Sequence, residues 1–373
     1  MNTLEQEIQN RLTKCREKLV ERNLEAYVIT DSEDIWYLTN INYSPEQRPF
    51  FLIVFANQDP LFIVPKLEES HVQVPYFKYT IDTYFDVTAK KGQNWFEVVT
   101  RHLVNVNHVG VEDNVPWYLT YQTGDINWTP GEIIKQLRTI KSDYELDKIQ
   151  VTAKVCSDVV CQTLATVHTG SNVLDLYMLP HKTQSEVISK NFSLTNRITN
   201  GVWPASYSYM PHSIPAMDAQ VSKGPNVNVA TFKLAGYAAE CERTFFTEDP
   251  TSEEQRHFNQ MMQARKIMLD MIRPGVKASE VEQAVYNYVE EQGLTQHLLH
   301  RPGHGIGLNN HEEPTLSFGN DTRLQKNMVV SVEPGLYFDG QGGYRHSDTV
   351  CITDNGYRFM TQAPDQLNEL ILK

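Results

Sequence analysis

The sequence predicts an α/β domain followed by an α+β domain. The chain has 373 residues, which is long for one domain, because domains cluster near ~100–200 residues. Helical and strand patterns alternate in the first part, as in an α/β domain. Long helical patterns mixed with strand patterns fill the second part and favour an α+β domain. We therefore divide the chain into residues 1–141 and 142–373.

The first domain opens with a helical pattern at 4–22, where Leu12, Leu19 and Val20 recur at helical spacing. Short runs rich in β-branched and aromatic residues then predict buried strands. These runs lie at 26–30, 49–55, 61–64 and 108–111.

The second domain begins at a capping box. The side chain of Ser142 can accept from the backbone N–H of Glu145, whose carboxylate can reach back. A helix is expected from there to about residue 168. Further helices are expected at 173–188, at 252–272 and at 279–292, the last opened by a second capping box of Ser279 and Glu282. Strands are expected at 226–233, 240–247, 328–333 and 348–353.

Composition excludes several classes of protein. The net charge of −13 argues against a nucleic-acid partner, since phosphate binding needs a basic face. No apolar run approaches the ~20 residues of a membrane span, so we expect no membrane partner. The five cysteines are scattered without CxxC spacing, which argues against a disulfide framework or a structural zinc site. With a polar N-terminus that lacks a secretory signal, these features predict a cytoplasmic protein.

Candidate chemistry gathers in three segments. The first, Gly303-His-Gly-Ile-Gly-Leu-Asn-Asn-His-Glu-Glu-Pro314, contains His304 and His311, and its glycines allow a close approach of the backbone; histidines in an ordinary turn are the alternative. In the second, Glu333 ends an apolar strand before a Pro-Gly turn. In the third, Glu240 and Glu242 share one face of a strand, unless that strand is simply exposed and charged.

These segments, with Gly342-Gly-Tyr-Arg345 after them, resemble the pita-bread family. The family contains creatinases, Xaa-Pro dipeptidases, aminopeptidase P and methionine aminopeptidases. The resemblance implies a creatinase/prolidase-type N-terminal domain at 1–141, a pita-bread catalytic domain at 142–373, and a homodimer.

The metallopeptidases of this family bind two metal ions through Asp, Asp, His, Glu and Glu. The resemblance places these ligands at Val229, Glu240, His304, Glu333 and Ser347. Two of the five positions lack a carboxylate, and carboxylates bridge and neutralise such ion pairs. We therefore expect no dinuclear site, no metal and no cofactor, although a single ion at Glu240, His304 and Glu333 stays open.

The departures resemble creatinase and ectoine hydrolase, the metal-free branch. That resemblance implies three catalytic residues, His212, Glu242 and Glu333. It implies a further set that binds the substrate: His304, His311, Glu240 and, from the neighbouring subunit, Arg48, for which an ordinary loop arginine is the alternative. Ala238 and Thr315 replace two residues that contact creatine in creatinase, so the substrate should differ from creatine.

Electrostatics supports a metal-free site. Three glutamates without a metal disfavour one another's ionisation, and a planar amidinium would pair with them. The sequence thus predicts a metal-independent, creatinase-like hydrolase that cleaves a C–N bond in a small amidine or guanidino substrate bearing a carboxylate. The alternatives are a metal-dependent Xaa-Pro dipeptidase or aminopeptidase with a degenerate metal site, and an inactive pita-bread binding module.

Overall fold

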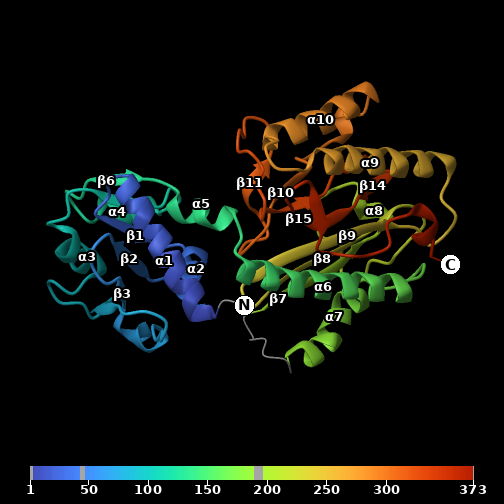
Figure 1. The fold of residues 1–373 in the computed structure, drawn as a ribbon. Helices are drawn as coiled ribbons and strands as arrows, with labels where there is room; N and C mark the ends of the chain where they lie inside the picture. Colours follow the sequence, from blue (N-terminus) through green and yellow to red (C-terminus); the bar gives the residue numbers. More distant parts are fainter. Residues whose placement is uncertain (1–2, 43–46, 189–195, 373) are drawn as a thin grey trace. The chain divides into compact units, whose positions relative to one another are not determined.

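The structure is a computed structural model that describes residues 3–42, 47–188 and 196–372 (Figure 1). The chain divides into two compact units, Met1–Arg138 and Thr139–Lys373. Within the described ranges, no helix has both the length and the apolar character that crossing a membrane requires.

The first unit is built around a mixed β-sheet. Its helices are α1 Leu4–Glu21, α2 Ser32–Thr39, α3 Trp95–Leu103, α4 Trp117–Tyr121 and α5 Ile133–Thr139, with the 3-10 helix η1 Lys66–His71. Its strands are β1 Ala26–Ile29, β2 Phe51–Phe55, β3 Leu61–Pro65, β4 Thr80–Tyr84, β5 Val109–Val111 and β6 Trp128–Pro130. The strand order is β4-β3-β2-β1-β5-β6, with β1 antiparallel to β2 and parallel to β5.

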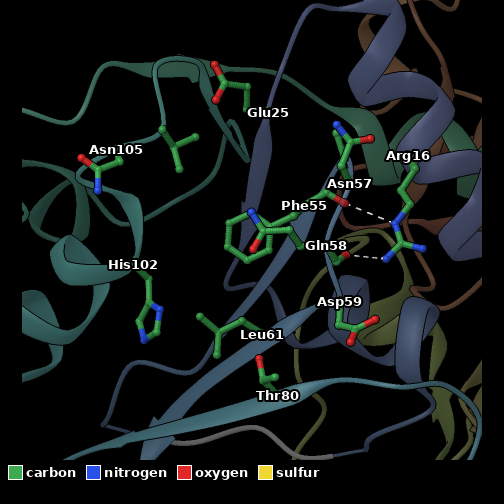
Figure 2. A pocket seen from close by; sticks show the side chains of 12 residues that line it. Arg16, Glu25, Phe55, Asn57, Gln58, Asp59, Leu61, Thr80, His102 and Asn105 are labelled. Atoms are coloured by element: carbon green, nitrogen blue, oxygen red, sulfur yellow. Dashed lines mark hydrogen bonds between the residues drawn. The ribbon is translucent and has the colours of Figure 1, made fainter.

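An open groove of about 850 Å³ lies where the turn between β2 and β3 approaches the end of α3 (Figure 2). Arg16 lines it, and its guanidinium donates to the backbone oxygens of Phe55 at 3.2 Å and Gln58 at 2.8 Å. The residues that line the groove include none of those predicted for catalysis or substrate binding. The residues predicted for catalysis and substrate binding therefore lie elsewhere in the chain.

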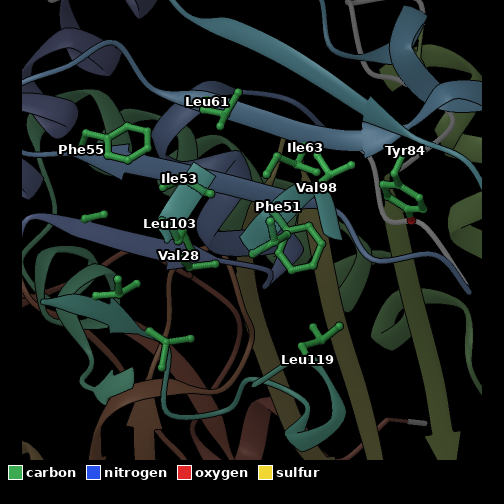
Figure 3. Close-up of a cluster of buried hydrophobic side chains, with 14 residues drawn as sticks. Val28, Phe51, Ile53, Phe55, Leu61, Ile63, Tyr84, Val98, Leu103 and Leu119 are labelled. Atoms are coloured by element: carbon green, nitrogen blue, oxygen red, sulfur yellow. The ribbon is translucent and has the colours of Figure 1, made fainter. Parts of the chain in front are cut away.

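The core of the first unit explains why its strands are apolar without interruption. On one face of the sheet, Val28, Phe51 and Ile63 pack with residues of α3 such as Val98 (Figure 3). Residues of the opposite face are buried as well, as Leu52 shows. A sheet covered on both faces selects continuous apolar runs instead of alternating ones.

The second unit contains longer helices and a larger sheet. Its helices are α6 Asp143–Thr166, α7 Val173–Ile188, α8 Ala205–Ser208, α9 Ser252–Met271 and α10 Ala278–Glu291, with 3-10 helices η2 Thr295–His297 and η3 Leu367–Glu369. Its strands are β7 Arg197–Trp203, β8 Asn226–Leu234, β9 Tyr237–Phe245, β10 Gly303–Gly305, β11 Glu312–Leu316, β12 Val329–Val332, β13 Gly335–Phe338, β14 Gly342–Arg345, β15 Ser347–Ile352 and β16 Tyr357–Phe359.

The order of the larger sheet brings distant segments together. The strands run β11-β10-β12-β15-β9-β8-β7, so β10 lies beside β12. In the same sheet β9 lies between β8 and β15 (Figure 1). In this ladder Glu242 is opposite Val229 on one side and Ser347 on the other. The segments that carry the predicted chemistry thus share one sheet.

Two local expectations have different outcomes. The capping box of α6 is confirmed, because Ser142 and Glu145 exchange hydrogen bonds of 3.1 and 3.2 Å. The capping box predicted at Ser279 is wrong: α10 begins at Ala278, and the carboxylate of Glu280 accepts from the N–H of Lys277 at 2.9 Å. The N–H of Ser279 instead donates to a neighbouring loop, at the carbonyl oxygen of Asn320.

Strand β9 begins at Tyr237, three residues before the expected start. Ala235 and Gly236 both have positive φ, 47° and 89°. Consecutive positive φ values are typical of the tight two-residue turn of a β-hairpin. The turn therefore joins β8 to β9 directly and lengthens both strands.

Candidate active site

The two glutamates of β9 are buried inside the second unit. Glu240 is 2% exposed and Glu242 is 4% exposed, so the alternative of an exposed charged strand is wrong. Glu333 follows β12, and His304 is fully buried on the short strand β10. The sheet order therefore places acidic groups from two strands around one imidazole.

Glycines fix the position of His304. A Cβ added to Gly303 would lie 2.3 Å from the backbone oxygen of Ser331, and one added to Gly305 would lie 2.3 Å from that of Glu313. Real Cβ atoms do not approach oxygen so closely, so neighbouring backbone packs directly against bare Cα atoms. This packing holds β10, and with it the backbone of His304, against the neighbouring strands.

His304 and Glu333 form an ion pair. The Nε2 atom of His304 lies 3.0 Å from Oε1 of Glu333, while its Nδ1 donates to the carbonyl oxygen of Gly305 at 3.0 Å. Burial lowers the pKa of His304, but the charges of Glu240 and Glu333 outweigh burial and raise it to about 9. Burial likewise raises the pKa of Glu333, but the hydrogen bond and charge of His304 outweigh it and lower that pKa to about 2.

His311 completes a cluster that fits a metal ion. Its ring centroid lies 4.0 Å from that of His304, with the rings at 70°. Burial, followed by the charge of His304, lowers the pKa of His311 and favours its neutral form. His304, His311 and Glu333 each offer one ligand atom, and these atoms lie within 4.8 Å of one another. Two imidazoles and a carboxylate at this spacing fit one divalent ion.

The residues do not fit the pair of ions that the resemblance implies. Val229 offers no donor atom, and the hydroxyl of Ser347 is engaged with Glu240 at 2.6 Å. Ser331 donates to the same Oε1 atom of Glu240 at 2.5 Å, and the amide of Asn310 donates to Oε2 at 2.8 Å. Glu240 is therefore held by the protein itself.

Glu242 is paired with a cation that sequence reasoning missed. Arg345, the last residue of β14, donates from Nη2 to Oε1 of Glu242 at 3.2 Å and contacts Oε2 through Nε. Burial raises the pKa of Glu242 to about 8, although the charge of Arg345 opposes this shift. Arg345 ends the motif Gly342-Gly-Tyr-Arg345, but the motif does not show which residue it pairs with.

A hydrogen-bonded chain extends from this pair. Nη1 of Arg345 donates to the hydroxyl of Tyr337 at 3.2 Å. That hydroxyl lies 2.7 Å from Nε2 of His300, whose Nδ1 faces the carbonyl oxygen of Arg301 at 2.7 Å. Because a carbonyl oxygen only accepts, His300 donates from Nδ1 and accepts from Tyr337. The chain orients Arg345 toward Glu242.

Two predicted residues lie outside this buried cluster. His212 is exposed on the loop after α8. Burial lowers the pKa of His300, and the charge of Arg345 adds to that shift, although the charge of Glu333 opposes it. Arg48 belongs to the first unit, where its Nε donates to Asp86 at 3.0 Å. Their roles toward a substrate stay predictions.

Comparison with known proteins places the chain in a family. Residues 147–354 match metallopeptidase family M24, and residues 11–140 match the creatinase/prolidase N-terminal domain. The M24 match covers more than half of the chain, so the protein belongs to this family of hydrolases. The predicted two-domain architecture, an α/β domain plus an α+β pita-bread domain, is confirmed.

Known proteins are similar to this protein over nearly the whole chain. YkvY of Bacillus subtilis, provisionally assigned as a dipeptidase, is 28% identical, with 96% of this chain and 99% of YkvY covered. Two solved structures share the fold. The dipeptidase PepE of Mycobacterium ulcerans has a TM-score of 0.84 at 24% identity, with 100% of both chains covered. The prolidase of Pyrococcus horikoshii has a TM-score of 0.80 at 21% identity, with 96% of this chain and 99% of that chain covered.

The expectation of a metal-independent, creatinase-like amidine hydrolase is wrong. The family is one of metallopeptidases, and the three similar proteins named above are a provisionally assigned dipeptidase, a dipeptidase and a prolidase. These relatives do not support placement in the creatinase and ectoine hydrolase branch. The structure gives the physical reason, because Arg345 neutralises Glu242 and hydroxyls hold Glu240. Neither carboxylate is left free to bind an organic cation.

Proposed function

We propose that this protein is a metal-dependent dipeptidase of family M24 whose substrates include dipeptides with a C-terminal proline. The convergence of His304, His311 and Glu333 on one point carries this proposal, since these side chains can hold a divalent ion. The similarity to YkvY, PepE and the Pyrococcus prolidase supports the substrate class.

The bound ion would supply Lewis-acid polarisation of a carbonyl oxygen and a bound water of lowered pKa. The chain's own residues prepare the site for both. Glu240, 3.7 Å from Nε2 of His304, adds a fixed negative charge that favours a cation. Glu242 and Arg345 form a nearly neutral buried pair beside it. His311 lies at the exposed edge of the cluster, so an ion held there would be open to a substrate.

Hydrolysis of dipeptides tests this function. The purified protein should be incubated with Mn²⁺, Co²⁺ or Zn²⁺ and a panel of dipeptides with and without C-terminal proline, and the released amino acids measured. We expect cleavage with at least one ion. His304→Ala should reduce kcat/KM by about 100-fold or more, because a metal ligand is lost.

His168→Ala provides a matched control. His168 is an exposed histidine outside the cluster, and its Nδ1 faces the carbonyl oxygen of Thr169. Its replacement should leave kcat/KM unchanged. Absence of cleavage with every ion and dipeptide, or full activity in His304→Ala, would show that the proposal is wrong.

A further inference from the structure

Both oxygens of Glu240 are occupied by hydrogen bonds from the protein. Oε1 accepts from Ser331 at 2.5 Å and Ser347 at 2.6 Å, and the two serine oxygens lie 3.1 Å apart. Two donors use both lone pairs of a carboxylate oxygen. Oε2 accepts from Asn310 at 2.8 Å. Coordination of a metal through Oε1 would therefore break an existing buried hydrogen bond.

His304, by contrast, can offer a lone pair to a metal ion when the Nε2 proton of its ion pair with Glu333 is released. Its Nδ1 must donate to the carbonyl oxygen of Gly305, so the neutral ring carries its lone pair on Nε2. That atom faces Glu333 at 3.0 Å. A metal-binding histidine commonly donates its second nitrogen to a backbone carbonyl, which fixes the ring orientation. His304 therefore has the geometry of a metal ligand.

The donor set around that lone pair differs from an all-carboxylate cluster. His311 lies edge-on to His304, and the ligand atoms of His304, His311 and Glu333 are within 4.8 Å of one another. Two imidazoles and one carboxylate leave a fourth position open, as in mononuclear catalytic zinc sites. Imidazole nitrogen suits Zn²⁺ better than Mg²⁺ or Ca²⁺, which prefer oxygen ligands.

A second ion would lack ligands. Val229 is apolar and lies opposite Glu242 in the β8–β9 ladder. Glu242 itself is paired with Arg345, and Ser347 donates to Glu240. A pair of ions needs carboxylates to bridge and neutralise it, and these positions supply none that is free.

We infer that this chain binds a single Zn²⁺-type ion through His304, His311 and Glu333, and that Ser331 and Ser347 hold Glu240 beside the ion without coordination. The inference rests on the proposed function, whose metal site it specifies. It replaces the sequence-based option of a single ion at Glu240, His304 and Glu333 by a set that includes His311.

Metal titration without substrate tests the inference. The full-length protein should be stripped with a chelator and titrated with Zn²⁺ by calorimetry and with Co²⁺ by visible absorption. We expect one ion per chain. His311→Asn should weaken binding at least tenfold and alter the Co²⁺ bands, whereas Ser347→Ala should keep one ion and the same bands.

Glu240→Gln and Glu333→Gln form a matched pair, because each removes one negative charge and preserves the side-chain shape. Glu333→Gln should weaken binding at least tenfold more than Glu240→Gln, and only Glu333→Gln should change the Co²⁺ bands. Circular dichroism melting confirms that each variant is folded.

Three results would overturn the inference: two ions per wild-type chain, no binding at micromolar Zn²⁺, or Co²⁺ bands that depend on Glu240 and not on His311. Failure of the proposed function is distinguishable. One bound ion without dipeptide cleavage contradicts the function alone, and two bound ions with cleavage contradict this inference alone.

Discussion

Each glutamate of the candidate site has its own partner within the second unit. Glu333 pairs with His304, Glu242 pairs with Arg345, and Glu240 accepts from serine hydroxyls. A buried charge that is paired and hydrogen-bonded avoids most of the cost of leaving water. The site therefore tolerates three carboxylates without an organic cation.

Removal of Arg345 tests the Glu242 pair. We expect Arg345→Met to lower the free energy of unfolding by about 3–5 kcal/mol, because Glu242 would remain buried and unpaired. The double variant Glu242→Gln/Arg345→Met should recover a large part of that loss. Urea denaturation followed by circular dichroism measures both. Equal stability of Arg345→Met and the wild type would refute the pairing.

Sequence reasoning reached these glutamates and histidines but missed their partners. Glu240 and Glu242 stand out because two acidic residues in an apolar strand are rare in a core. Ser331 and Arg345 do not stand out, because a serine or an arginine is ordinary in its own segment. The bond from Ser331 to Glu240 joins residues 91 positions apart. Only the order of the strands shows such pairs.

At the scale of elements, the sequence predicts the N-terminus of α6 correctly, with Ser142 as its N-cap residue. Ser142→Ala should destabilise the protein by about 1 kcal/mol, since an orphan N–H loses its acceptor. Ser279→Ala is the matched control, because Ser279 lies within α10, where alanine is a good helix former. We expect that control to be neutral or slightly stabilising in urea denaturation. A larger loss for Ser279→Ala would contradict the helix start at Ala278.

Glu112, the residue that follows β5, should make the stability of the first unit depend on pH. Glu112 is buried and accepts from the N–H groups of Thr30 at 2.8 Å and Asp31 at 3.1 Å. Burial, with the charge of Asp34, raises the pKa of Glu112 from 4.5 to about 8. Because its pKa is higher in the folded state than in the unfolded state, the Glu112 side chain stabilises the protein fully below about pH 4.5. This contribution to the free energy of unfolding is lost as pH rises through about 8.

Glu112→Gln should therefore lose less stability than the wild type between pH 5 and pH 8. Melting temperatures measured across this range at constant ionic strength give the comparison. Parallel curves for the two proteins would show that Glu112 does not titrate as the burial requires.

For the whole molecule, sequence patterns established the fold class better than the function. Apolar runs and capping residues indicate local structure, and the order of the motifs along the chain indicates the family. The functional hypothesis failed because it rested on absent carboxylates at Val229 and Ser347. It did not include the internal cation Arg345, which pairs with Glu242. Homodimer formation, the absence of a nucleic-acid partner and cytoplasmic location stay predictions.

Parallel measurement of metal content and peptidase activity tests the proposed function most directly. The protein should be stripped with a chelator, assayed with a proline-containing dipeptide, and then reconstituted stepwise with Zn²⁺, Co²⁺ or Mn²⁺ while bound metal is determined. We expect no cleavage in the stripped protein and cleavage that rises in proportion to bound ion. Full cleavage by protein shown to contain no metal would contradict a metal-dependent dipeptidase.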